Sequence, residues 1–547
     1  MKTIKYLAAA VLVLMTASCS KSRVAQMEMA ENVISTCSPK VLECVAGKIP
    51  ATVSVTYPEG YFAPDAMMIV TPVLVYDGGE QVGQSYIYQG EKVRDNNKVV
   101  AYKAGGTVTE KMVFTYAPGM EKSHLELRSA VIYNSKRIDI PAVKVADGCN
   151  TTYMLVSKSG VYAYKPDGYE EVEHRTSESQ IRYDVNSSDI RSTSANRSAM
   201  QDIKATLDEA KENSRIKVRG TEIIAYASPE GGEDLNAKLS DKRAESAKKA
   251  WSQATKGSEA ATTEIKSIGQ DWDGFQEAVA KSKIEDKDLI LRVLSMYSDP
   301  AVRESEIKNM SAIYSELKDE VFPELRRARF ITNIDYQNFS DEEIEKLSEK
   351  RLYMLSEEQV LRLATISETA DRRAMYYRLA AERFGSDKGY YNLAMVNLDA
   401  DKNEVAEVYL AKVSDQLDPD VLNAKGVIAL RNGDLEAAAN YFKKSGTAEA
   451  KENLAAIDII NGDYAAAQTK LAGTGSENEG LADILTGKLD AASAALKGDD
   501  ARTAYLKAVV AARKGKADAV KSNLKAAGAD AALSERAAKD IEFADFR

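Results

Sequence analysis

A repeated pattern of small, turn-forming and large apolar residues near the C-terminus restricts the fold more than any other feature of this chain. A small residue is followed by a turn residue seven positions later, a small residue at twelve and a large apolar residue at sixteen. The clearest copy is Gly426, Gly433, Ala438 and Phe442. The other copies are Ala394, Asp401, Ala406, Leu410; Ala455, Gly462, Ala467, Leu471; Gly480, Gly487, Ala492, Leu496; and Ala508, Gly515, Val520, Leu524. Successive copies begin 32, 29, 25 and 28 residues apart, a spacing typical of stacked helical hairpins.

These offsets resemble the tetratricopeptide repeat, in which small residues let the two helices of a pair approach closely. The resemblance implies an α-helical solenoid over residues 341–547 that presents a concave surface to partner proteins. Polar and charged residues at the exposed positions favour an extended peptide or another envelope protein over lipid as the partner. An unrelated Ala-rich helical bundle is the alternative interpretation.

Residues 175–340 alternate between strand and helix patterns, which predicts an α/β unit. The predicted strands are 181–185, 216–227, 265–268 and 329–336. An amphipathic helix follows the second strand, since Leu235, Leu239, Ala244 and Trp251 fall close to one apolar stripe. A long charged helical insertion is predicted over residues 273–323, broken at Asp299-Pro300.

Three sequence pieces of this unit occur in the order typical of one known domain. Residues 224–231 read Ile-Ala-Tyr-Ala-Ser-Pro-Glu-Gly, and residues 236–244 read Asn-Ala-Lys-Leu-Ser-Asp-Lys-Arg-Ala. An Arg-Arg pair at 326–327 precedes the last strand. The combination resembles the OmpA-like (OmpA/MotB C-terminal) domain, in the form common in Bacteroidetes envelope proteins.

The resemblance implies non-covalent binding of peptidoglycan, in which a loop Asp and a helix Arg hold the diaminopimelate of the stem peptide. Arg243 matches the Arg and offers a planar fork suited to a carboxylate. Ser228 stands where the family has Asp, so one charge-assisted contact is lost, and Glu230 is the candidate to replace it. The predicted peptidoglycan-binding residues are Ser228, Glu230, Asn236, Arg243, Arg326 and Arg327.

A scaffold role without wall binding is the alternative for the same domain. In that interpretation Asn236 only caps the start of its helix and Arg243 lies on the solvated helix face. The insertion over 273–323 would then cover or reshape the cleft.

Residues 37–167 show strand periodicity and predict an antiparallel β-sandwich. Residues 51–57 alternate with period two, and 68–76 form an apolar run that ends in an Asp-Gly-Gly turn. Further strands are predicted at 106–116, 125–133 and 136–145, the last with an edge position or a bulge at Pro141. This domain shows no catalytic constellation, which favours a structural or docking role.

The first residues predict export. Lys2 and Lys5 precede an apolar run over 6–15 that is too short to span a bilayer, and small residues then lead to Cys19. This layout indicates a signal peptide at 1–18, a lipidated Cys19 and a tether over 19–36, although Thr16 stands where lipoprotein signals usually carry Leu. The stretch after Cys19 has no acidic residue, which favours a periplasm-facing protein of the outer membrane. A soluble secreted protein is the alternative.

Charge and missing motifs narrow the function classes. A net charge of −10 provides no electrostatic footprint for nucleic acid. Cys37, Cys44 and Cys149 lack metal-ligand spacing and permit one disulfide with one thiol left over, so neither a metal nor a cofactor is expected. There is no nucleophile elbow and no phosphate loop, and the one suggestive carboxylate pair is Asp271 and Asp273. An enzyme is not expected.

The sequence therefore predicts a non-enzymatic outer-membrane lipoprotein with three kinds of contact. A lipidated Cys19 would anchor the chain in the membrane, the OmpA-like domain would bind peptidoglycan, and the repeats would bind envelope proteins. The alternative is a scaffold subunit of an outer-membrane export or assembly complex that does not bind peptidoglycan.

Overall fold

A computed structural model describes residues 24–29, 32–256 and 263–547, so Cys19 and the predicted signal peptide lie outside the described residues. The chain forms two compact units: Met1–Lys165 together with Asp387–Arg547, and Pro166–Ser386. The second unit is therefore an insertion into the first. This division differs from the predicted boundaries, because residues 341–386 group with the central domain and the N-terminal domain groups with the repeats.

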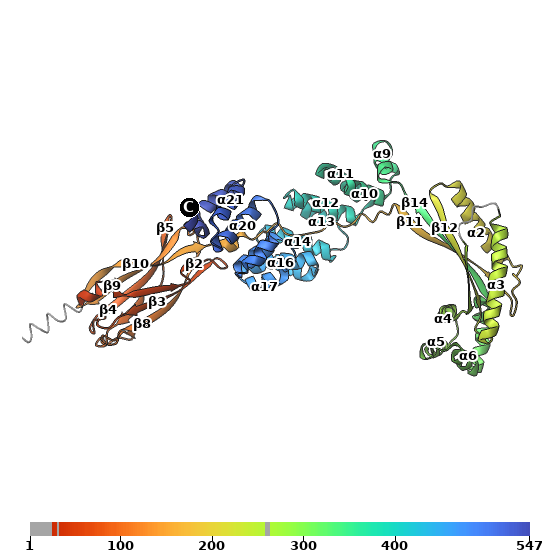
Figure 1. Ribbon diagram of the computed structural model, residues 1–547, viewed down its shortest axis with the longest axis horizontal. Coiled ribbons are helices and arrows are strands. Elements are labelled where there is room, and N and C mark those ends of the chain that lie inside the picture. The colour runs from red at the N-terminus through yellow and green to blue at the C-terminus, as the bar shows by residue number, and fades with distance from the viewer. Residues whose placement is uncertain (1–23, 30–31, 257–262) are drawn as a thin grey trace, which may run out of the picture. The chain divides into compact units, whose positions relative to one another are not determined.

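Two β-sheets form the N-terminal domain (Figure 1). One has the order β1 (Ile34–Ser38), β3 (Lys48–Tyr57), β8 (Gly106–Thr115). The other has the order β2 (Val41–Glu43), β10 (Lys136–Asn150), β9 (Ser123–Tyr133), β4 (Met67–Tyr76), β6 (Tyr86–Gln89), β7 (Lys98–Val99), with β5 (Gly79–Val82) paired to β4. Most pairs are antiparallel, as predicted, while β2 with β10 and β6 with β7 are parallel. The register of β10 shifts between Ile140 and Val143, which confirms a bulge at Pro141.

The central domain is a four-stranded sheet with the order β11 (Val172–Arg182), β14 (Arg327–Gln337), β12 (Ile216–Ala227), β13 (Thr263–Gln270). Only β12 and β13 are parallel. Helices α2 (Ser194–Glu212) and α3 (Glu233–Ala254) cross between the strands and lie together over the sheet (Figure 1). Their apolar faces bury a core in which Trp251 of α3 stacks on Phe330 of β14 at 5.9 Å.

The predicted helical insertion lies between β13 and β14. It consists of α4 (Trp272–Lys281), α5 (Lys287–Met296), α6 (Pro300–Asn309), α7 (Ser311–Glu320) and α8 (Phe322–Leu325). These helices have their own core around Phe275, Leu317 and Phe322. The predicted break is confirmed, because Asp299 caps α6 and Pro300 is its first residue.

Three helices follow β14 within the second unit, namely α9 (Asp341–Arg351), α10 (Glu357–Ile366) and α11 (Ala370–Phe384). The hairpins of the first unit then begin. They pair α12 (Asp387–Asp399) with α13 (Asn403–Leu410), α14 (Pro419–Arg431) with α15 (Leu435–Ser445), α16 (Ala448–Asn461) with α17 (Tyr464–Leu471), α18 (Glu477–Leu485) with α19 (Leu489–Ala495), and α20 (Ala501–Arg513) with α21 (Ala517–Ala527). Helix α22 (Ala531–Lys539) and a 3₁₀ turn, η4 (Ile541–Phe546), end the chain.

The repeat offsets match the hairpins in every copy. The turn position has a positive φ in all five, including the non-glycine Asp401, so each hairpin reverses through a left-handed residue. The small residue on the first helix of a hairpin is fully buried in three copies, namely Ala394, Ala455 and Ala508. The helical-repeat architecture predicted for this region is confirmed from Asp387 onward.

None of the helices in the described part of the chain combines the length and the hydropathy that crossing a bilayer requires.

Candidate functional site

The six residues predicted to bind peptidoglycan come together at one end of the central sheet. Strand β12 ends at Ala227, the loop 228–232 follows, and α3 begins at Glu233. Ser228 and Glu230 lie in this loop, and Asn236 and Arg243 lie on α3. Arg327 is the first residue of β14, and Arg326 directly precedes it as the C-cap of α8. Because β12 and β14 are neighbours in the sheet, three segments distant in sequence meet at this edge.

Asn236 fixes the shape of the loop. Its side-chain amide is buried and donates hydrogen bonds to the carbonyl oxygens of Ser228 at 3.1 Å and Gly231 at 2.6 Å. The N-cap of α3 is Gly232, which has no side chain, so the interpretation of Asn236 as a helix cap is wrong. Asn236 is a positioning residue for the loop that carries Ser228 and Glu230.

Glu230 and Arg326 form a two-point ion pair at this edge. Arg326 Nε donates to Glu230 Oε1 at 2.8 Å, and Nη2 donates to Oε2 at 3.2 Å. The Ser228 hydroxyl donates to the same carboxylate at 2.6 Å. The Glu230 side chain is 20% exposed and that of Arg326 is 12% exposed, so solvent reaches part of both side chains.

Arg327 forms an ion pair whose carboxylate is more buried than that of the Glu230–Arg326 pair. Its guanidinium contacts the Asp271 carboxylate at 2.9 and 3.0 Å, and the Asp271 side chain is only 2% exposed. Asp271 also accepts a hydrogen bond from the Gly274 amide at 2.9 Å and thereby caps α4. Burial raises the pKa of Asp271, while the nearby Arg327 guanidinium acts to lower it. The carboxylate that looked suggestive in the sequence is thus a helix cap and an ion-pair partner.

Arg243 is almost completely buried and is held by backbone. Its Nε, Nη1 and Nη2 donate to the carbonyl oxygens of Ser187, Tyr226 and Asp184 at 3.0, 2.9 and 3.0 Å. The guanidinium also lies 5.1 Å from the centre of the Tyr183 ring. Burial lowers the pKa of Arg243 to about 10, so the side chain stays charged at neutral pH. The alternative that placed Arg243 on a solvated helix face is wrong, because its side chain is among the most buried in the chain.

The helical insertion is linked to the loop through Gln270, the last residue of β13. Gln270 Nε2 donates to the Gly231 carbonyl at 2.9 Å and lies 3.4 Å from the Glu304 carboxylate of α6. Gln270 and Asp271 were not predicted as parts of this site. Gln270 ends β13 and Asp271 follows it, so the signal in the sequence that could have placed them here is their position at the end of a strand.

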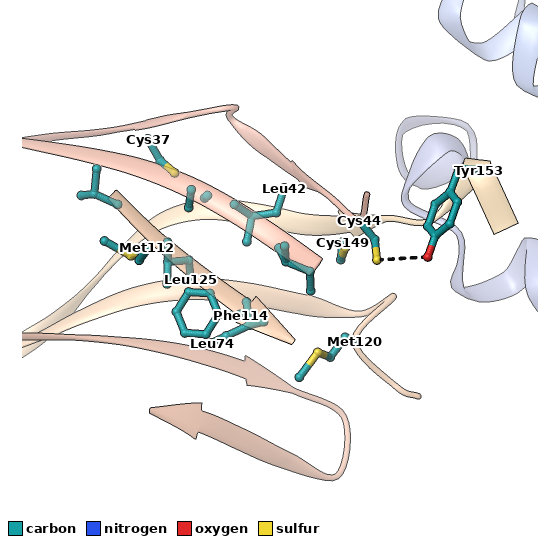
Figure 2. Packing of buried hydrophobic residues seen from close by; sticks show 14 of the residues in the cluster. Cys37, Leu42, Cys44, Leu74, Met112, Phe114, Met120, Leu125, Cys149 and Tyr153 are labelled. Atoms are coloured by element: carbon teal, nitrogen blue, oxygen red, sulfur yellow. Dashed lines mark hydrogen bonds between the residues drawn. The ribbon is translucent and has the colours of Figure 1, made fainter. Parts of the chain in front are cut away.

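Two of the three predicted thiols lie side by side in the N-terminal domain (Figure 2). Cys44 and Cys149 are buried on neighbouring segments, where the Cys44 amide donates to the Asn150 carbonyl at 2.8 Å. A hydrogen bond from Cys149 lowers the pKa of Cys44 to about 7, and Tyr153 Oη accepts a bond from the Cys44 thiol at 3.7 Å. Cys37 is buried apart from this pair, and burial raises its pKa.

In an oxidising compartment we expect Cys44 and Cys149 to form the disulfide and Cys37 to remain a thiol. A thiolate is the attacking species, and only Cys44 has a lowered pKa together with an adjacent thiol. The bond should stabilise the domain by about 2–4 kcal/mol. Peptide mapping of protein that has been exposed to an oxidising buffer, under non-reducing conditions, should recover a 44–149 linked peptide and an alkylated Cys37. Recovery of a link that includes Cys37 would contradict this assignment.

Comparison with known proteins adds little. No known family model matches the chain, and no curated protein matches it. Among solved structures the chain is similar to a component of the crystal structure of the APC/C hetero-tetramer Cut9–Hcn1, with 22% sequence identity and a TM-score of 0.22. The chain spans only 38% of that chain, and the similarity covers 38% of this one. A similarity this distant says nothing about function.

Proposed function

We propose that this protein is a non-enzymatic lipoprotein of the outer membrane that contacts peptidoglycan through its central domain and envelope proteins through its helical repeats. Export by residues 1–18 and acylation of Cys19 would supply the anchor, since multiple acyl chains bury about 0.8 kcal/mol per methylene in the bilayer. The resemblance to the OmpA-like domain supports the wall contact. The single observation that carries it is the partly exposed Glu230–Arg326 ion pair.

This ion pair is complementary to the ligand that the resemblance implies. The head group of diaminopimelate carries an ammonium and a carboxylate on one carbon. Arg326 can transfer its two-point hydrogen bond from Glu230 to the ligand carboxylate, and the freed Glu230 can accept the ligand ammonium. One intramolecular pair is thereby replaced by two intermolecular pairs, so neither charge is left unpaired.

The roles of the other predicted residues follow from their contacts. Asn236 directs its donors at carbonyl oxygens of the loop and therefore shapes it. Arg243 instead directs its donors at the end of β12 and at the segment 184–187, and therefore holds these two segments against α3. Arg327 is committed to the buried Asp271. Ser228 contributes one hydrogen bond to Glu230 and no charge. In this proposal Glu230 takes over the function of the Asp that the family carries at the Ser228 position.

Co-sedimentation of the mature chain with purified sacculi tests the wall contact. Arg326→Gln and Glu230→Gln should each weaken retention by about 10- to 100-fold, because each removes a charge-assisted contact of about 1.5–3 kcal/mol. Arg219→Gln is the matched control, since it breaks an ion pair with Asp335 towards the other end of the same sheet. Free diaminopimelate should compete for binding, whereas 1,5-diaminopentane, which lacks carboxylates, should not. Unchanged retention of both pair variants would contradict the proposed site.

A scaffold subunit of an export or assembly complex is the second candidate function. The observation that favours it is the saturation of Arg243 by three carbonyl oxygens, which leaves the family's carboxylate-binding Arg engaged within the protein. In that case the wild-type chain would fail to sediment with sacculi. Crosslinking in intact cells would instead recover a transmembrane barrel complex.

A further inference from the structure

An asparagine recurs on the first helix of four successive hairpins. The residues are Asn392 on α12, Asn423 on α14, Asn453 on α16 and Asn478 on α18, at spacings of 31, 30 and 25 residues. We call these four side chains the asparagine row. Asn392, Asn423 and Asn453 are nearly fully buried even though a side-chain amide is costly to bury without partners. Each of these three therefore needs a polar partner.

That partner is the backbone of the chain's own segment 155–165, which leads from the N-terminal domain to the central domain. Asn478 accepts from the Ser157 amide at 2.7 Å and donates to the Ser157 carbonyl at 3.0 Å. Asn453 does the same with Val161 at 2.7 and 2.8 Å. Each asparagine side chain thus forms hydrogen bonds with both the N–H and the C=O of one residue, as the backbone of a neighbouring β-strand would.

The first hairpin completes the series. Asn392 accepts from the Lys165 amide and donates to the Lys165 carbonyl, both at 2.8 Å. Asn423 donates to the Val161 carbonyl at 2.9 Å and accepts from Asn453 at 3.0 Å. The doubly bonded residues are spaced by four, or roughly 13 Å of extended chain. The segment runs opposite to the hairpin order, since its C-terminal end lies on the first hairpin.

Side-chain contacts give the segment a defined register. The Tyr162 hydroxyl donates to Asp399 at 2.6 Å, and the Tyr164 hydroxyl bonds to the same carboxylate. The Lys165 ammonium lies 2.9 Å from both Asp418 and Asp420. Carboxylates of the first two hairpins therefore bind two aromatic hydroxyls and one cation of the segment.

Gly160 marks the tightest point of the contact. Its φ of +73° is one that other residues rarely adopt. A Cβ at this position would lie 2.6 Å from a methyl carbon of Val427, which is fully buried on α14. Neither the backbone conformation nor the packing of the segment tolerates a side chain here.

We infer that the helical repeats are a backbone-reading peptide receptor whose ligand is residues 155–165 of the same chain. The asparagine row supplies sequence-independent affinity, and Asp399, Asp418 and Asp420 select the Tyr-x-Tyr-Lys register. The receptor face is occupied in the folded protein, so it is closed to a partner's extended peptide. The envelope partner in the proposed function then has to use a different surface of the repeats. This inference does not depend on peptidoglycan binding.

Hydrogen exchange on the wild-type chain provides the first test. The amides of Ser157, Val161 and Lys165 should exchange at least about 100-fold more slowly than the same amides in a synthetic peptide of residues 151–167. Exchange at the free-peptide rate for these three amides would overturn the inference, whatever the variants below do.

Binding in trans provides the second test. A fluorescein-labelled peptide of residues 155–165 should not bind the wild-type chain or the Ser159→Val control, whose substitution is at an exposed position of the segment. It should bind the Gly160→Val chain, in which the attached segment is displaced, and adding Asn453→Leu should weaken that binding at least about tenfold. Equal binding to wild type and Gly160→Val would overturn the inference. So would no binding to a Gly160→Val chain that keeps the wild-type circular dichroism spectrum.

Discussion

Replacing Phe442 by Ala is expected to lower the free energy of unfolding of the repeats by about 3–5 kcal/mol, the usual range for a buried Phe. Phe442 is the large residue of its repeat copy and is fully buried on α15. Its ring rests on Gly426 of α14, where an added Cβ would lie 2.5 Å from a ring carbon. Removing the ring leaves a cavity between α14 and α15 that the surrounding helices fill only in part.

Hydrogen exchange of the α14–α16 amides in urea is the appropriate measurement, because it reports on these hairpins rather than on the whole chain. Leu417→Ala, at a side chain that is 76% exposed, is the matched control and should change stability by less than about 0.5 kcal/mol. Gly426→Ala alone should cost about 1–3 kcal/mol through overpacking. The double variant should lose less than the sum, because the cavity makes room for the methyl group. A Phe442→Ala chain as stable as the control would contradict the packing role of the repeat pattern.

The repeat architecture was predictable because its signals are local. The seven-residue step to the turn and the sixteen-residue step to the large residue lie within a single hairpin. Even Asp401, which breaks the glycine rule at the turn, is in the left-handed conformation that the pattern requires. Three strands of the central sheet were predictable for the same reason, and β12 occupies the predicted range. The first strand was placed wrongly, because β11 (Val172–Arg182) shares only its last two residues with the predicted range 181–185.

The occupant of the repeats was not predictable, because the contacts join residues far apart in sequence. Asn392 and Lys165 are separated by 227 positions, and Asn478 and Ser157 by 321. Within residues 155–165 the pattern gives no indication of a ligand. The one available signal was an asparagine recurring on the first helix of the first four copies, a residue that favours caps and turns over helix interiors.

At the candidate peptidoglycan site the sequence predicted which residues would lie together but not which partners they would bind. The motif order placed Glu230 and Arg326 near one another, and the structure joins them. The sequence did not indicate that the Arg243 guanidinium would bind backbone carbonyls, because these contacts depend on how the segment 184–187 packs against α3. If Arg243 binds the ligand, its substitution should abolish sacculus binding without lowering stability. If Arg243 is structural, the same substitution should lower the stability of the central domain.

Replacing Arg243 by Leu is expected to lower the free energy of unfolding of the central domain by at least about 3 kcal/mol. The substitution removes the donors to three carbonyl oxygens, and each buried acceptor left without a donor costs about 1–3 kcal/mol. It also removes the contact with the Tyr183 ring. Loss of sacculus binding by an Arg243 variant would therefore report destabilisation of the central domain rather than a lost ligand contact.

Tryptophan fluorescence during urea unfolding measures this effect directly, because both tryptophans of the chain, Trp251 and Trp272, lie in the second unit. Lys242→Leu is the matched control, since it removes a cation at the adjacent exposed position of α3 and should leave the midpoint nearly unchanged. An Arg243→Leu chain with the stability of the Lys242→Leu control but no sacculus binding would reverse the roles. Arg243 would then be the ligand-binding residue of the family, and the Glu230–Arg326 pair would be a structural ion pair.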